Sequence, residues 1–575
     1  MTDKRTNFDR RRFLATSGLL GGSVLAGCTG GDGGQETTTG GAGTTTAESM
    51  GGGTETTEEQ QQNVQGGGTF IGTTAEDATT LDPRMNELAW VNGFLHYIFD
   101  TLYLPSPDGK KFVPHLAKEQ PKQQDDTTFV IPLKEGVTFH NGDELTAEDV
   151  AYSINWMLDP ANKSPNKANL DFIDTVEASG KYEATFNLKY PFALFQLVLS
   201  GMNAGIVSKS AAEQKGQKKF GQDPVGSGPF AFDKHVSSSH IDLARNEDYF
   251  LKKPNLGKVR MRIIPKPQVQ FVELASGGVH QATVPKNLIG KAKSEQGIKM
   301  KRISHFDYNG LIFNSMRKPF DNVKVREAMQ YLVDYDEILK ATKGQLGKRS
   351  YGFMPKDVNK SWEFPWKEWK EKYYPAKDHQ KAKQLLKEAG YGGGMDKTLK
   401  ISSLASSKFK NMAIILQKEL KKVGIEANVR EVTIGQWLTE LDSGEFDVNI
   451  YGWSGGQDPD GFYYYLFRDL RNDEGGMNDD VVGNATAAYL YQTQDSDKLQ
   501  KVDETIRQAR RTNDRAERKK MYIDAAETWQ SLYPHIPVFS EQAVTGWSKD
   551  VKDYEPSAFT QQPLCNEWSN AYIQK

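Results

Sequence analysis

The sequence predicts a mixed α/β protein, and the stretch 398–453 carries most of that prediction. An alternating strand around Leu399 is followed by apolar residues at helical spacing through 412–423. Gly424 then stands where a helix ends in a left-handed residue, and a second alternating strand begins at Ile425. A strand, helix and strand of this length imply a parallel pair joined by a right-handed crossover.

Three further helices have recognisable beginnings. Thr146 and Asp149 have the spacing of a capping box, and Asp378 precedes another apolar helical pattern. Asp321 is expected to cap a third helix in the same way. Arg326, on that third helix, is expected to pair with a nearby carboxylate.

Composition and charge place the body among soluble proteins with large cores. The chain has 575 residues, of which 37% are hydrophobic and 26% charged, and this length suggests three or four domains. A formal net charge of -3 argues against a general nucleic-acid binder. A polytopic membrane protein is excluded because no run of 18 apolar residues occurs. Two cysteines exclude a disulfide scaffold and a Cys-rich zinc site.

The first 68 residues indicate targeting and a tether instead of a fold. Residues 1–27 carry paired arginines at 10–12 before a short apolar stretch, the twin-arginine pattern of an export signal. The stretch ends at Leu25–Cys28, which resembles a lipobox, so Cys28 is the expected lipidation site. Residues 28–68 are rich in Gly and Thr, with six acidic and no basic side chains, and should be disordered. We expect a body held by lipid at the outer face of the cytoplasmic membrane, at the cell surface or in the periplasm.

A strand end offers the best place for a ligand. The strand predicted at 446–450 runs into Gly452 and Trp453, and open α/β sheets bind ligands beyond the carboxyl ends of their strands. The loop 453–461 is therefore the candidate binding loop. Trp453, just past the strand end, can stack on a ligand, and Asn314 follows another strand and can bond a ligand's polar groups.

Catalytic and metal-binding patterns are missing from the sequence. It has no Gly-x-x-x-x-Gly-Lys-Ser/Thr, no His-Glu-x-x-His and no Gly-x-Ser-x-Gly. Serines, histidines and aspartates are scattered, so a triad assembled in space stays open. These observations favour a binding protein without cofactor or metal over an enzyme. A surface-anchored hydrolase remains the alternative from another class.

Several motifs follow one another in a family's characteristic order. They are Leu81–Pro83, Phe129–Gly142, Thr146–Val150, Asp223–Phe230, Asn246–Phe250, Pro319–Ala328, Ala382–Tyr391 and Gly452–Trp453. Together these motifs resemble the extracellular solute-binding proteins of ABC importers often called family 5, which include dipeptide, oligopeptide and nickel binders.

The resemblance implies a two-lobed periplasmic-binding-protein-like fold of class II, with an additional small domain and a hinge between the lobes. A solute, most often a peptide, would be captured between the closing lobes and delivered to permease subunits in the membrane. The protein would be a monomer. It would bind no nucleic acid. The implied limits are 69–102, 223–305 and 538–575 for lobe I, 103–222 for an extra domain, and 306–537 for lobe II, with hinge crossings near 305 and 537.

The resemblance also suggests which residues meet the ligand. In the family's peptide binders an Asp shortly after Gly-Trp pairs with the ligand's α-ammonium, but here Gly455 and Gly456 occupy that place. Asp458 is the nearest substitute, although it matches more closely the Asp of the family's following Asp-Pro. Recognition of a free peptide N-terminus is therefore in question, since a buried ammonium without a carboxylate is costly. The expected ligand-binding set is Trp453, Asn314, Ser454, Gly455, Gly456 and Asp458.

Aromatic clusters suggest a second class of ligand. Six aromatic side chains crowd residues 362–374, and Phe462–Tyr465 follow the binding loop. Aromatic faces suit sugar rings as well as apolar peptide side chains, so an oligosaccharide is the alternative ligand. Packing within a domain is the simpler explanation for the first cluster. A structural or sensory surface protein that kept the fold without transport also remains open.

Overall fold

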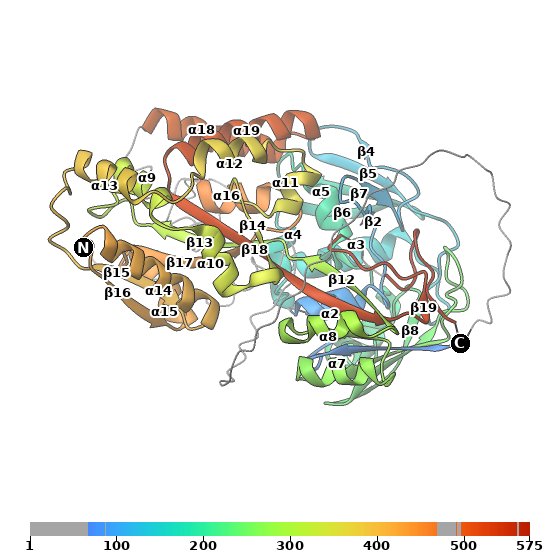
Figure 1. The fold of residues 1–575 in the computed structure, drawn as a ribbon. Helices are drawn as coiled ribbons and strands as arrows, with labels where there is room; N and C mark the ends of the chain where they lie inside the picture. The colour runs from blue at the N-terminus through green and yellow to red at the C-terminus, as the bar shows by residue number, and fades with distance from the viewer. Residues whose placement is uncertain (1–66, 87, 469–489, 491–495, 560–562, 575) are drawn as a thin grey trace, which may run out of the picture.

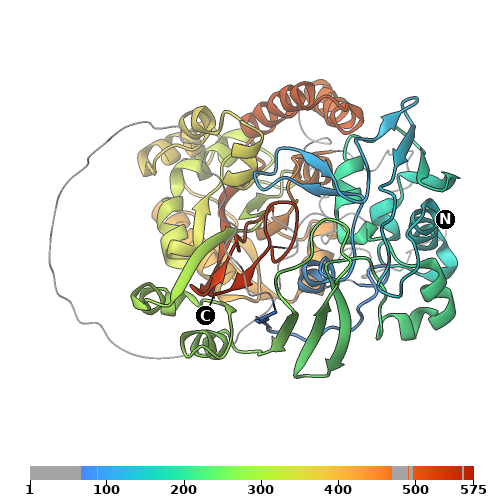
Figure 2. The ribbon, with the colours of Figure 1, turned by 90° about the vertical axis from the view of Figure 1, so that its right-hand side faces the viewer.

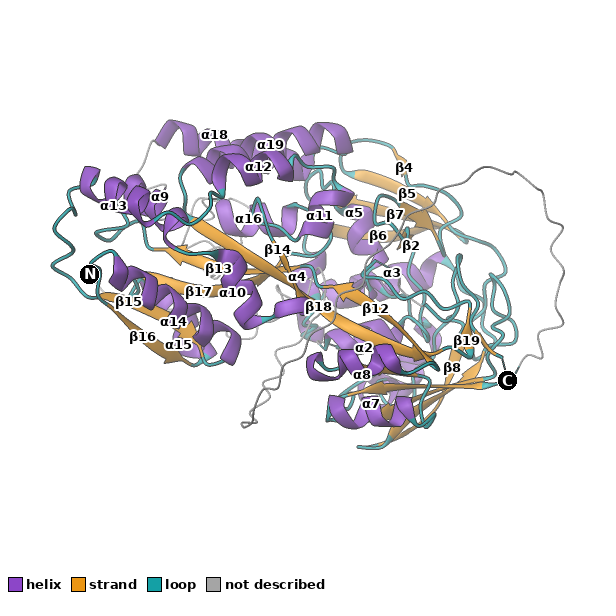
Figure 3. Cartoon of the chain, in the orientation of Figure 1, coloured by secondary structure: helices purple, strands orange, loops and turns teal. Residues whose placement is uncertain are grey.

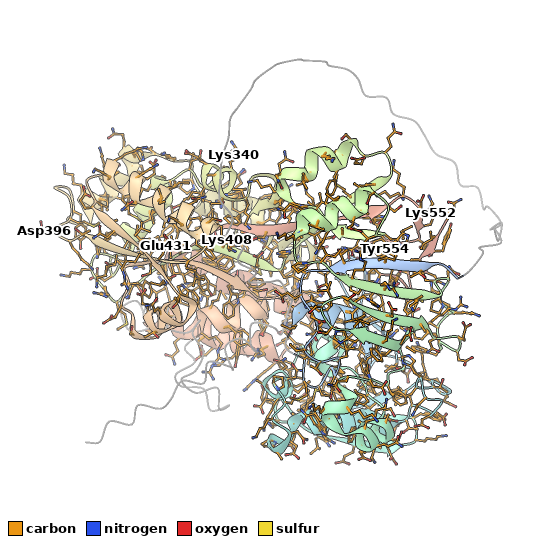
Figure 4. All side chains as sticks on the ribbon, turned by 90° about the horizontal axis from the view of Figure 1, so that it is seen from below. Lys340, Asp396, Lys408, Glu431, Lys552 and Tyr554 are labelled. Atoms are coloured by element: carbon orange, nitrogen blue, oxygen red, sulfur yellow. The ribbon has the colours of Figure 1, made fainter. Side chains whose placement is uncertain are left out.

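The computed structural model shows two lobes side by side (Figures 1 and 4). Figure 4 places Lys408 and Glu431 in one lobe and Lys552 and Tyr554 in the other. The expected signal, Cys28 and nearly all of the tether lie outside the described residues. Their predicted roles therefore stay predictions. No helix in the described part of the chain is long and apolar enough to cross a membrane. The described residues are 67–86, 88–468, 490, 496–559 and 563–574.

Lobe I is built on a four-stranded sheet with the strand order β1–β10–β9–β8. β1 runs parallel to β10, and the other neighbours are antiparallel. The strands are β1 (Thr69–Thr74), β8 (Phe230–Val236), β9 (His240–Arg245) and β10 (Lys258–Ile263). The helices of this lobe are α2 (Ala89–Leu95), α7 (Pro267–Ala275) and α8 (Ile289–Ser294). A short hairpin, β2 (Tyr103–Pro105) and β3 (Phe112–Pro114), leads out of it.

The extra domain contains a second, antiparallel sheet with the order β4–β5–β7–β6. Its strands are β4 (Lys122–Gln123), β5 (Thr128–Pro132), β6 (Ile173–Gly180) and β7 (Glu183–Leu188). Its helices are α3 (Ala147–Leu158), α4 (Lys167–Leu170), α5 (Phe195–Ser200) and α6 (Lys209–Phe220). The predicted capping box is confirmed, because the Asp149 carboxylate accepts the N–H of Thr146 at 2.9 Å. Phe186 of this domain and Leu243 of lobe I belong to one continuous core, so the two pack as a unit.

Lobe II contains the strand–helix–strand unit that the sequence predicts. β15 (Leu399–Leu404) and β16 (Ala427–Val432) are parallel, and α14 (Ser407–Lys422) connects them. Gly424 has a φ of +82°, the left-handed conformation expected after the helix. On its other side β15 pairs in parallel with β17 (Val448–Ser454), which pairs antiparallel with β13 (Asp307–Phe313). The surrounding helices are α9 (Val323–Leu332), α10 (Tyr335–Thr342), α13 (His379–Glu388) and α15 (Ile434–Ser443).

The beginning of α9 differs from the prediction in two respects. Asn322, not Asp321, caps the helix, and its side chain accepts the N–H of Lys324 at 2.9 Å. The buried guanidinium of Arg326 donates to the carbonyls of Phe320 and Leu532, at 2.6 and 2.8 Å, and not to a carboxylate. Burial lowers the pKa of Arg326 to about 10. Arg326 therefore joins two backbone segments inside the lobe.

One long strand belongs to both lobes. β18 (His535–Ser548) pairs with β13 through its first residues and with β12 (Ile298–Ser304) from Gln542 onward. Figure 1 shows it as the red arrow that runs across the molecule. β11 (Gln281–Thr283) and β14 (Gly347–Arg349) also pair with it. β12 ends at Ser304 and β13 begins at Asp307, and β18 changes its partner from β13 to β12 between Phe539 and Gln542. The two chain crossings between the lobes therefore lie next to each other.

A layer of helices covers the remaining side of lobe II and reaches the extra domain (Figures 2 and 3). Most aromatic side chains of both predicted clusters are buried here in one core, so they serve packing. The layer consists of α11 (Lys356–Ser361), α12 (Trp366–Tyr373), α16 (Asp460–Phe467), α18 (Ser496–Arg511) and α19 (Arg515–Ser531). Beyond β18 the chain returns to lobe I with β19 (Val551–Lys552) and β20 (Tyr572–Ile573).

Candidate functional site

Trp453 lies inside a strand and not beyond its end, which corrects the sequence prediction. β17 continues to Ser454, and Trp453 pairs with Tyr308 of β13. Its indole N–H donates to the carbonyl of Gly461 at 2.7 Å, and its ring stacks at 14° on Tyr451. The side chain is only 7% exposed. Trp453 therefore fixes the first turn of α16 to β17 and shapes the loop between them.

The two glycines of the loop are required by its geometry. The N–H of Gly455 donates to the carbonyl of Phe306 at 3.0 Å, and the Ser454 hydroxyl donates to the same carbonyl at 3.2 Å. A Cβ on Gly455 would come within 2.6 Å of the Phe462 ring, which leaves no space for a side chain. Gly456 has a φ of +77°, a conformation that favours glycine. The loop is thus tied to residue 306, where the chain passes from lobe I to lobe II.

Asp458 is already paired inside the protein. Its two carboxylate oxygens accept from the guanidinium of Arg518 at 2.8 and 3.2 Å. Burial lowers the pKa of Arg518, but Asp458, together with Tyr522 and Asp460, raises it above its ordinary value. In this arrangement Asp458 has no free charge to offer a ligand ammonium in place of the missing loop carboxylate.

Asp460 forms a second buried pair, which the sequence did not suggest. Its carboxylate accepts from the Arg510 guanidinium at 2.8 and 3.1 Å, and the hydroxyl of Tyr522 donates to it at 3.2 Å. Asp460 is fully buried, and Arg510 is 7% exposed. The Arg510 guanidinium also lies over the Tyr464 ring, 3.2 Å from its centroid. No local pattern could have revealed this pair, because its members are 50 residues apart.

Asn314 lies away from the other predicted residues. β13 and β17 are antiparallel, so Asn314 follows the end of the pair opposite to Ser454. At about 3.3 Å per residue, this separation is on the order of 20 Å. Its amide donates to the carbonyls of Gly444 and Phe446 at 2.8 and 3.1 Å, and its Oδ1 accepts the N–H of Met316. Asn314 therefore holds the turn before β17, and we leave it out of the candidate site.

A cavity that opens to solvent lies between the extra domain and lobe II, next to the first turn of α16. Across its edge the N–H of Ala193 donates to the carbonyl of Arg510 at 2.7 Å, and Arg510 also faces the Phe192 ring. Lobe II contributes Asp460, Tyr465 and Arg510 to the lining. The extra domain contributes Ala168, Asn169, Asp171, Phe172, Tyr190, Phe192, Leu194 and Val198. From the sequence, the ligand is expected between the two lobes, with no sign of a wall from the extra domain.

A serine, an aspartate and a histidine do meet in lobe I, but not as a catalytic triad. The Ser227 hydroxyl donates to Asp100 at 2.8 Å, and His115 Nε2 lies 2.8 Å from the other oxygen of the same carboxylate. The serine thus bonds the acid instead of the base, and all three side chains are at most 1% exposed. Within the described ranges no three His, Cys, Asp or Glu side chains are placed to hold a metal ion.

Comparison with known proteins identifies relatives of this chain. Residues 111–474, more than half of the chain, match the model of the bacterial extracellular solute-binding proteins, family 5, middle region. Di/tripeptide-binding protein 2 of Pseudomonas aeruginosa is 25% identical over 493 residues, which cover 80% of this chain and 87% of the relative. The glutathione-binding protein GsiB of Escherichia coli O157:H7 is 28% identical over 449 residues, with coverage of 76% and 82%.

Solved structures show the same fold. HbpA2 from Haemophilus parasuis matches with a TM-score of 0.76 and 21% identity, over 88% of this chain and 100% of that protein. The periplasmic binding protein DppA from Helicobacter pylori, solved in complex with the peptide STSA, matches with a TM-score of 0.67 and 24% identity, over 89% and 99%. The two-lobed fold is therefore that of periplasmic binding proteins. The chain belongs to the bacterial extracellular solute-binding proteins of family 5.

Proposed function

We propose that this protein is the substrate-binding component of an ABC importer, which captures a peptide between its lobes and delivers it to permease subunits. The relatives named above bind di- and tripeptides and glutathione, by their names. The observation that carries the proposal is the cavity between the extra domain, which packs with lobe I, and the first turn of α16 in lobe II, because segments distant in sequence form its two walls. A site of this kind can enclose a ligand when the walls approach.

We propose that the lobes move about β18 and the β12–β13 connection. In the described part of the chain two strand crossings join the sheets there, at residues 305–306 and where β18 changes partners near 540–541. The expected limits of lobe I, the extra domain and lobe II are kept, with the second crossing placed a few residues beyond 537. A ligand stabilises the closed form only through contacts that it makes better in that form.

In this proposal the binding loop recognises the ligand through its backbone. Gly455 and Gly456 carry no side chains, and Ser454 is the last residue of β17. A peptide is suited to such a surface, because main-chain groups can pair with main-chain groups while pockets select side chains. Trp453 does not contact the ligand in this proposal. It stabilises the loop conformation through its hydrogen bond to the Gly461 carbonyl.

A thermal-shift experiment tests the proposal. The full chain is melted with random tri- to pentapeptides and, in parallel, with a mixture of oligosaccharides. A ligand at 100 times its Kd should add about 2.7 kcal/mol of stability. A shift with peptides alone supports peptide capture. A shift with oligosaccharides alone would replace the ligand class, and no shift with either would overturn solute capture by this site.

We also propose that Cys28 carries lipid after the twin-arginine signal is removed. One acyl chain binds a membrane weakly, so stable anchoring requires more than one chain on Cys28. The variant Cys28→Ser should move the protein from the membrane fraction to the soluble fraction, while Cys565→Ser should leave it in place. Equal membrane association of both variants would overturn the anchor.

A further inference from the structure

The wall of the cavity that belongs to the extra domain carries two oxygen acceptors. Asp171 follows α4 directly, and Asn169 is the third residue of that helix. Both line the cavity from the side that faces α16 and α18. The two acceptors therefore point to a ligand group that donates hydrogen bonds.

Asn169 has an oxygen that needs a donor. The residue is 4% exposed, and its Oδ1 has no hydrogen-bond partner among the described residues. Its Nδ2 donates to the side-chain oxygen of Asn166 at 3.4 Å, and this bond fixes the orientation of the amide. Buried polar atoms are normally paired, which makes an unpaired acceptor at a cavity wall a candidate contact for a ligand.

Asp171 is the carboxylate of the lining that remains available. The other lining carboxylate, Asp460, is buried in its pair with Arg510. Asp171 instead faces Lys189 at 3.1 Å, and both side chains are more than two-fifths exposed. Surface ion pairs of this kind contribute little and exchange easily, so a ligand cation can replace the lysine.

The rings around these acceptors suit a cation. Phe172 and Phe192 stack with their centroids 4.1 Å apart, and Tyr190 meets Phe192 edge-on. The rings that line this wall attract cations through their faces, and Arg510 already uses Phe192 in this way. The positive charge of Arg510 does not repel a second cation strongly, because Asp460 neutralises it.

We propose that Asp171 and Asn169 receive a primary ammonium group of the bound solute, the α-ammonium of a peptide in the first instance. An ammonium has three donors, which match one carboxylate and one amide oxygen. This assignment rests on the proposed function. The extra domain thereby supplies the carboxylate that the Gly455–Gly456 loop lacks. Its wall recognises a peptide by the free N-terminus.

Matched peptide libraries test the assignment. Random tri- to pentapeptides without lysine are compared with the same library after N-acetylation, and bound peptide is quantified by mass spectrometry. The unmodified protein should retain the free-amine library at least about tenfold better, a difference of about 1.4 kcal/mol. Asp171→Asn should abolish this preference, and Asn169→Leu should reduce it. The matched control is Asp174→Asn, which changes an exposed aspartate of β6 outside the cavity lining.

The outcomes separate the two proposals. If the unmodified protein retains both libraries equally, or if Asp171→Asn keeps the preference, the ammonium assignment is wrong while peptide capture stands. If it retains neither library, peptide capture itself fails. N-acetylated peptides that contain lysine form a further arm. Their Asp171-dependent binding would show that the site receives a side-chain ammonium, and Asp171-independent binding would count against the assignment.

Discussion

Arg510 and Asp460 form a buried ion pair with three hydrogen bonds at the junction between lobe II and the extra domain. The guanidinium binds the carboxylate at 2.8 and 3.1 Å, and the main-chain carbonyl of Arg510 accepts the N–H of Ala193. One residue thus joins the end of α18 to the beginning of α16 and to the facing domain. The cavity wall in lobe II depends on this pair.

Removing one member of the pair should destabilise the protein strongly. Arg510→Met leaves the Asp460 carboxylate buried without its partner, which typically costs about 3–5 kcal/mol. Denaturant unfolding measures the loss. Lys324→Met, which breaks an exposed pair with Glu388, is the control and should cost at most about 1 kcal/mol. Equal losses in the two variants would contradict the structural role of Arg510.

Adding a methyl group to the loop should impair binding. Gly455→Ala places a Cβ against the Phe462 ring, so either the loop or α16 must shift. We expect a loss of about 1–3 kcal/mol in stability and a loss of the peptide-dependent thermal shift. Gly393→Ala, at a position with nothing within 4 Å of the added Cβ, should change neither quantity. Normal peptide binding by Gly455→Ala would exclude the loop from the site.

Trp453 should behave as a core residue. Trp453→Ala removes a buried indole and should cost about 3–5 kcal/mol even without ligand. Trp453→Phe keeps most of the packing but leaves the Gly461 carbonyl without its donor, at a cost of about 1–3 kcal/mol. Thermal unfolding of the unliganded variants measures both. An unchanged melting temperature for Trp453→Ala would mean that the indole is not part of this core.

Two buried histidines should make the protein sensitive to acid. Burial lowers the pKa of His535 to about 3, and burial, with His115 nearby, lowers that of His96 to about 3. Below about pH 6.5 the unfolded chain binds protons that the folded histidines do not, so stability falls as the pH decreases toward 3. We expect a slope of about 1–3 kcal/mol per pH unit in unfolding experiments. His535→Gln should flatten it by about 1 kcal/mol per unit, and an unaltered slope would show that His535 is not buried neutral.

The sequence predicts the parts of this fold whose signals are local. The parallel β15–α14–β16 unit, the Thr146–Asp149 capping box and the left-handed Gly424 each depend on neighbouring residues, and each is confirmed. The end of β17 could not be predicted in this way. Its last residues are held by β13, more than a hundred residues earlier in the chain, so no local pattern marks where the strand ends.

Contacts between residues distant in sequence also limited the prediction of the site. The loop after Gly452 stays a prediction, and of its residues Asp460 alone is among those that line the cavity. Asn314 lies apart from the loop, because the antiparallel pairing of β13 with β17 separates the two strand ends. Asp458 looked free in sequence, whereas its partner Arg518 lies 60 residues away. The facing wall around Asn169 and Asp171 comes from a different domain, and only the folded chain brings it to α16.

Native mass spectrometry of the full chain with random tri- to pentapeptides tests the central claim most directly. We predict one peptide bound per chain in the unmodified protein, and loss of that complex in Gly455→Ala but not in Gly393→Ala. The absence of a peptide complex, or equal binding by both glycine variants, would contradict peptide capture at the cavity next to the first turn of α16.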